Sequence, residues 1–232
     1  MRRFALIAFA LGAACAAARA DDTAAAVAGE SRAAASRLAE ARKHVAAKKW
    51  GQAVALWQAV IDAPGSDLVA AEEGRLVAAR RLAHAGLAKL PAKELERYRD
   101  KVEGQAKRWL AEGLRDDDDL ALARVVEEAF VSRQAVDAAD RLGDRAFLRG
   151  RFDEAEAWWR LIAPLRRAPG DGERLVYPDP PPAVAARLRA KQLLARLFRG
   201  EEGWEADLAA YRKRHPKASG QFAGRKIGRA HV

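Results

Sequence analysis

Residues 152–159, FDEAEAWW, repeat the pattern of an earlier stretch, residues 50–57, WGQAVALW. In each stretch an aromatic residue comes first, an alanine follows three positions later, and a tryptophan ends the stretch seven positions after the start. Offsets of three and seven place the three side chains on one face of an α-helix. The two stretches therefore predict two similar amphipathic helices, which begin 102 residues apart.

The residues around the second stretch predict two closely packed helices. Gly143 precedes the stretch and Ala155 lies within it, and neither has a side chain large enough to hold two helices apart. We expect Trp159 to fill the wider space beside them, on the same face as Phe152. Gly150, between the two helices, suits the left-handed conformation that ends many helices.

The first stretch predicts the same arrangement with less agreement. It keeps Trp50, Ala53 and Trp57 but has no glycine ahead of the aromatic residue, where Gly150 precedes Phe152 in the second stretch. We place the turn between the two helices at residues 49–51. A third candidate hairpin, ending in residues 204–216, matches only in part.

The order of residues from Leu142 to Ile162 (Leu-Gly, Ala, Gly, Phe, Ala, Trp, Ile) resembles the tetratricopeptide consensus. The separation of 102 residues is three times the 34-residue period of that family. The resemblance implies an all-α fold of antiparallel helical hairpins stacked as a short tetratricopeptide-like solenoid, which binds a protein or peptide partner. The alternative is an irregular helical bundle with ordinary apolar stripes.

The pattern of helices and breaks divides the chain into six parts. We predict a signal peptide at 1–20, a loose lead-in at 21–30, a helical-repeat domain at 31–168, a Pro/Gly-rich connector at 169–182, a final helical hairpin at 183–216 and a tail at 217–232. Within the repeat domain we expect a helix that Ser66 caps, with Asp67 in its first turn, and that ends near Ala85 with Gly86 as its break. No alternation of Val, Ile and Thr predicts a sheet.

The N-terminus has the pattern of an export signal. Arg2 and Arg3 precede an apolar run, residues 4–18, and an A-x-A cleavage site ends at Ala20. The pattern predicts an exported protein of the periplasm or cell envelope. An uncleaved anchor is the alternative and the only segment by which we expect the chain to enter a membrane, although the run is short for a span.

Several further stretches together resemble a more specific family, the exported bacterial (planctomycete-type) proteins with pyrroloquinoline-quinone-binding-like β-propeller repeats. The stretches are residues 125–130, 158–161, 177–180, 187–194, 211–216 and 220–225. The resemblance implies that this chain is the helical N-terminal part of a larger protein. Residues 227–232 resemble the translation of a sequencing adapter, and we expect the natural chain to diverge at about Lys226. No propeller residue or cofactor is carried over.

No motif of a catalytic, nucleotide or metal site occurs in the sequence. There is no GxGxxG, GxxxxGK[ST], GxSxG or HExxH, and His44, His84, His215 and His231 lack the spacing of metal ligands. Residues 116–119 are four aspartates without the pattern of a calcium loop, so we interpret them as a helix cap. We therefore predict no enzyme activity, no cofactor and no metal.

The candidate partner-binding residues lie on the first helix of each hairpin. They are Arg42 in the first hairpin and Asp137, Asp140 and Asp144 in the second, where spacings of three and four form one stripe. A solvated helix face remains the alternative for each. The formal net charge is +10, which leaves open a basic envelope protein that binds an anionic polymer or lipid surface. For an exported protein we expect no nucleic-acid partner.

Overall fold

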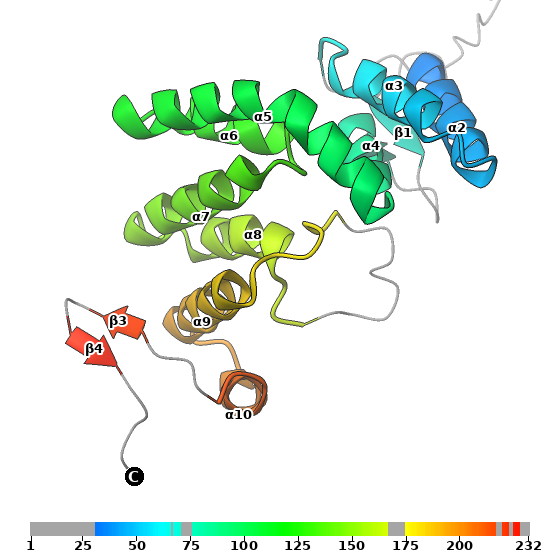
Figure 1. Ribbon diagram of the computed structural model, residues 1–232. Helices are drawn as coiled ribbons and strands as arrows, with labels where there is room; N and C mark the ends of the chain where they lie inside the picture. The colour runs from blue at the N-terminus through cyan, green and yellow to red at the C-terminus, as the bar shows by residue number, and fades with distance from the viewer. Residues whose placement is uncertain are drawn as a thin grey trace, which may run out of the picture.

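The computed structural model describes residues 31–65, 67–70, 76–166, 175–216, 220–222 and 225–227, and these are mostly helical, which confirms the predicted all-α class (Figure 1). Helices in the described ranges are α2 (Arg32–Ala46), α3 (Trp50–Ile61), α4 (Ala79–Ala88), α5 (Ala92–Arg115), α6 (Asp119–Glu128), α7 (Arg133–Leu148), α8 (Phe152–Ile162), α9 (Pro182–Phe198) and α10 (Trp204–Arg214). The predicted signal peptide and lead-in lie outside the described residues.

Each helix packs mainly against its neighbours in sequence. The closest pairs are α2 with α3, α3 with α4, α5 with α6, α6 with α7, α7 with α8, and α8 with α9. Helix α5 also packs against α7, so the first helices of two successive hairpins touch each other. In Figure 1 the pairs α5–α6, α7–α8 and α9–α10 follow one another away from the group formed by α2, α3 and α4.

The turns that join α2 to α3 and α7 to α8 have nearly the same backbone. Each turn has three residues, and their backbone angles match position by position. The first turn consists of Ala47 (φ −85°, ψ 4°), Lys48 (φ 56°) and Lys49 (φ −89°, ψ 64°). The second consists of Arg149 (φ −85°, ψ 3°), Gly150 (φ 74°) and Arg151 (φ −88°, ψ 68°). The first turn is therefore 47–49 rather than 49–51. Lys48 takes the left-handed conformation without being glycine, at a cost of about 1 kcal/mol.

Both turns satisfy the carbonyl groups at the end of the first helix in the same way. The amide of Lys49 donates to the carbonyl of His44 at 2.8 Å, and the amide of Arg151 donates to the carbonyl of Ala146 at 2.9 Å. This bond, from the third residue beyond the helix, is the one that a left-handed cap provides. The sequence match between residues 50–57 and 152–159 is thus accompanied by a match in backbone geometry.

The two tryptophans of the repeated pattern are both buried against a glycine, but on different sides. A Cβ atom at Gly143 would lie 2.2 Å from the indole nitrogen of Trp159, as expected for a ring that fills the space beside a glycine on the preceding helix. Trp57 instead contacts Gly86 on the following helix, where a Cβ atom would lie 2.4 Å from the ring. The prediction that Gly86 ends a helix is wrong, because α4 continues to Ala88. Position 86 has to be a glycine because a side chain there would collide with the ring of Trp57.

The prediction of a helix from Ser66 to about Ala85 is wrong for the first half of that segment. Ser66 itself lies outside the described residues, but β1 (Leu68–Ala70) and β2 (Leu76–Ala78) pair as antiparallel strands, with Val69 opposite Val77. Both strands read Leu-Val-Ala, and a β-branched valine packs well in a strand. Backbone bonds tie the ribbon to its neighbours, since the amide of Ser31 donates to the carbonyl of Leu68 at 2.8 Å. A second ribbon pairs β3 (Gly220–Phe222) with β4 (Arg225–Ile227).

The described part of the connector, residues 175–181, has no helix or strand, as predicted, yet it is firmly attached to the core; residues 169–174 lie outside the described residues. Tyr177 is buried, and its amide donates to the carbonyl of Leu161 at 2.7 Å. Its ring meets Phe130 edge-on with centroids 6.1 Å apart, and Arg99 donates to its hydroxyl at 3.2 Å. The connector therefore joins α8 to the loop between α6 and α7.

Candidate functional site

Two of the three acids of the stripe on α7, Asp140 and Asp144, form ion pairs with another helix of the chain. Asp140 accepts hydrogen bonds from Arg187 at 2.7 Å and from Lys191 at 2.6 Å, both on α9. Lys191 also donates to Asp144 at 2.6 Å. Burial raises the pKa of Asp137, the neighbouring Asp140 carboxylate adds to the rise, and Arg187 opposes it. The stripe thus holds α7 and α9 together, which the spacing of the acids alone does not reveal.

Arg42, the fourth candidate partner-binding residue, lies on α2 and not beside the acidic stripe of α7. It borders a pocket of about 690 Å³ between α2, α3 and α4. Most of the residues around this pocket are apolar, among them Leu38, Val45, Trp50, Trp57, Leu82 and Leu90. Lys89 is the second cation at this pocket, and in the described ranges no ion pair joins the side chain of Arg42 or Lys89 to an acid. A pocket with apolar walls and two uncompensated cations suits an acidic segment that also carries apolar side chains.

A larger cavity, of about 1100 Å³, lies between α4, α8 and residues 175–179. His84 borders it and is buried, with its Nε2 atom 2.8 Å from the carbonyl oxygen of Glu127 and its ring tilted against Phe130. Burial lowers the pKa of His84 to about 4, and the charge of Arg80 adds to this effect. His84 is therefore neutral at pH 7, and its observed role is to tie α4 to α6.

The four aspartates at 116–119 form the turn between α5 and α6. The Asp118 carboxylate accepts from the amide of Leu120 at 2.8 Å, which confirms the interpretation as a helix cap. Asp117 and Asp119 each pair with the buried Arg145 of α7 at 2.5 Å. Although burial pushes the pKa of Asp119 upward, hydrogen bonds from Arg145 and Arg149 hold it below its usual value. No pattern in the sequence indicates that Arg145 is buried at this point.

The described residues contain neither a metal-binding cluster nor a membrane-spanning helix. Within these ranges no group of three or more His, Cys, Asp and Glu side chains is arranged to hold a metal ion. No helix in the same ranges is long and apolar enough to cross a membrane.

Comparison with known proteins adds no relative. No family model matches the chain, and neither a curated protein nor a solved structure is significantly similar to it.

Proposed function

We propose that this chain is an exported, non-catalytic protein–protein interaction module built from tetratricopeptide-like hairpins, and the N-terminal part of a larger β-propeller repeat protein. The observation that supports the repeat is the agreement of two hairpins that begin 102 residues apart. They share the order of rings and alanine, the angles of a three-residue turn, and a buried tryptophan at the last position of the pattern, although Trp159 contacts a glycine of the preceding helix and Trp57 one of the following helix. Stacked hairpins of this kind offer grooves to partners rather than catalytic groups.

The pocket beside Arg42 is the binding site that the geometry favours. Its apolar side chains supply contact area, and Arg42 and Lys89 supply positive charge that no described acid neutralises. We infer that it accepts an acidic, amphipathic peptide segment, whose carboxylates lie near the two cations. The acids Asp140 and Asp144 are less available, because Lys191 already pairs with both.

The test uses the full chain and a labelled synthetic peptide of Leu and Glu that forms an amphipathic helix. Arg42→Glu combined with Lys89→Glu should weaken binding about tenfold, since each exposed ion pair contributes up to about 1 kcal/mol. The matched control, Arg37→Glu with Lys93→Glu, reverses two exposed cations that do not line the pocket. Absence of binding to the unaltered chain, or an equal loss in both variants, would refute this site.

The alternative function, binding of an anionic polymer or lipid surface, makes a different prediction. Affinity for polyphosphate or anionic vesicles would fall steeply with salt and would be insensitive to the Arg42 and Lys89 changes. Many cations in the described ranges are already paired within the chain, which leaves fewer for such a surface. They include Arg133, Arg145, Arg149, Arg187, Lys191 and Arg199.

A further inference from the structure

Large apolar side chains are exposed mainly at one edge of the molecule. In the described ranges Leu148 is 83% exposed, Leu120 81% and Phe198 56%. Leu114 and Leu197 are also exposed, and only Leu76, at 45%, belongs to another part of the chain. The first five of these residues, which we call the turn edge, flank the turns α5–α6, α7–α8 and α9–α10.

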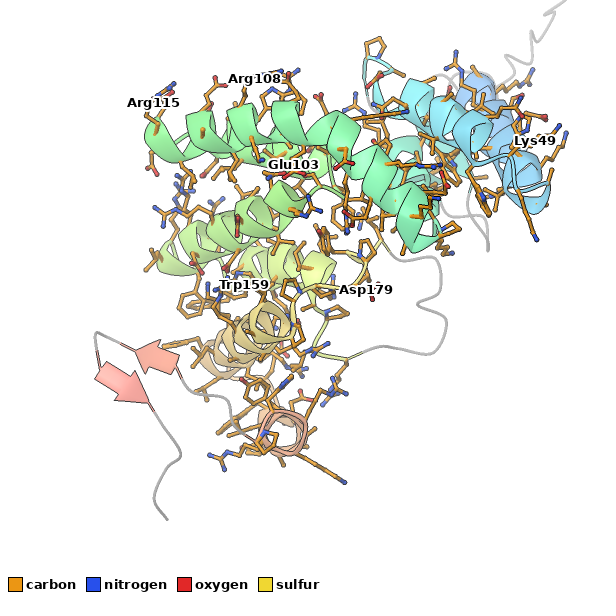
Figure 2. All side chains as sticks on the ribbon, in the orientation of Figure 1. Lys49, Glu103, Arg108, Arg115, Trp159 and Asp179 are labelled. Atoms are coloured by element: carbon orange, nitrogen blue, oxygen red, sulfur yellow. The ribbon has the colours of Figure 1, made fainter. Side chains whose placement is uncertain are left out.

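The three turns lie side by side, so the turn edge is one surface. Asp119, at the start of α6, pairs with Arg149 at the end of α7 at 2.6 Å. Arg199, just after α9, pairs with Asp153 of α8 at 3.1 Å. Figure 1 shows the three turns on the same side, and Figure 2 labels Arg115 there, at the end of α5.

Aromatic contacts fix the centre of the turn edge. The ring of Phe198 stacks on Phe152 with centroids 5.5 Å apart and meets Phe147 edge-on, also at 5.5 Å. Phe147 in turn meets Phe152 at 5.1 Å. The half-exposed Phe198 is thus held in place by Phe147 and Phe152, and the exposed Leu148 directly follows Phe147 in the chain. A rigid apolar surface of this kind loses little side-chain freedom when a partner covers it.

The two outer turns of the turn edge have a net negative charge, opposite to that of the whole chain, whereas the middle turn, residues 149–154, has two acids and two arginines. The chain has 42 Lys and Arg against 32 Asp and Glu. Residues 115–119 have four acids and one arginine, and residues 199–205 have three acids and one arginine. The side chains of Asp117 and Asp153 are 77% and 92% exposed, so part of this negative charge reaches solvent although both are paired.

We propose that the turn edge binds a cationic amphipathic helix of a partner protein. The apolar face of that helix would cover Leu120, Leu148 and Phe198, and its Lys and Arg side chains would lie beside the acids of the two outer turns. A second copy of the chain fits poorly, because a two-fold contact would place acidic turns against acidic turns. A lipid surface with anionic headgroups meets the same repulsion. This surface is separate from the pocket at Arg42 and does not depend on it.

The experiment titrates the full chain with a labelled amphipathic helix of Leu and Lys, at physiological salt. Binding should exceed that of a scrambled peptide of the same composition. The Leu and Glu helix, which we expect at the Arg42 pocket, should not compete with it. Leu120→Ser with Leu148→Ser should weaken it at least about tenfold, since each leucine contributes apolar area to the contact. Both side chains are almost fully exposed in the free chain, so the variant should fold normally.

Two control variants test whether the loss of binding is specific to the turn edge. Leu76→Ser, an exposed leucine outside the turn edge, should leave affinity unchanged within about twofold. Arg42→Glu with Lys89→Glu should not weaken binding of the Leu and Lys helix, so failure of either site is recognised independently. Equal loss in the Leu76 variant would overturn the proposal. Self-association, or binding to anionic vesicles, that disappears in the Leu120 and Leu148 variant would overturn it as well, and would assign the edge to a second copy or a membrane.

Discussion

Replacing Gly143 with alanine puts a methyl group where the structure has no room for it. The new carbon would lie 2.2 Å from Nε1, 2.6 Å from Cε2 and 2.7 Å from Cδ1 of Trp159. The indole is buried, and Lys191 lies 5.6 Å above its ring, so the ring cannot move aside freely. Its N–H also donates to the carbonyl of Asp140 at 3.3 Å, a bond that any shift would weaken.

These effects can be combined into an expected change in the free energy of unfolding. Overpacking of a core costs about 1–3 kcal/mol, and loss of the hydrogen bond about 1 kcal/mol. Alanine offsets about 1 kcal/mol of this, because it favours a helix interior over glycine. We therefore expect Gly143→Ala to destabilise the protein by about 2 kcal/mol.

Urea denaturation followed by circular dichroism measures this change. Gly104→Ala is the matched control, because Gly104 also lies inside a helix but a Cβ atom there meets nothing within 4 Å. That variant should be more stable than the natural chain by up to about 1 kcal/mol. If Gly143→Ala proves as stable as Gly104→Ala, the close approach of α7 and α8 at Trp159 is refuted.

Three further predictions concern the turns and the buried polar groups. Lys48→Gly should raise stability by about 0.5–1 kcal/mol and Gly150→Ala should lower it by a similar amount, because both positions have positive φ; thermal denaturation that shifts both variants in one direction would contradict this. Burial lowers the pKa of His84 to about 4 in the folded chain, from about 6.5 in the unfolded chain. Stability should therefore fall by about 3 kcal/mol as the pH is lowered from the higher to the lower value, and a His84→Gln variant that keeps the whole loss in urea denaturation would exclude this cause. Tyr177→Phe should cost about 1 kcal/mol through loss of the bond from Arg99, and an unchanged melting temperature would show that bond to be dispensable.

Local features of the fold could be predicted from the sequence because they depend on neighbouring residues. The start of α8 at Phe152, the left-handed Gly150 and the packing of Trp159 follow from helical spacing and turn chemistry. The cap at Asp118 follows from acids that precede an apolar helix.

Features that depend on distant partners could not be predicted in this way. Gly86 has the spacing of a helix end, and only the position of Trp57, 29 residues earlier, explains why a glycine is needed inside α4. Of the candidate site, the sequence singled out Arg42 but not Lys89, which reaches the same pocket from the end of α4. It also identified the acids of α7 without the cations of α9 that neutralise them, since no periodic pattern records which charges meet across two helices.

The packing of each helix on its neighbours in sequence has a consequence for how the chain acquires its structure. Contacts that join nearby segments close short loops, so little entropy is lost before each contact forms, and such chains fold fast. A helix pair can form as soon as its own residues can reach one another, before more distant segments take part. We therefore expect the chain to fold one hairpin after another, from one end to the other.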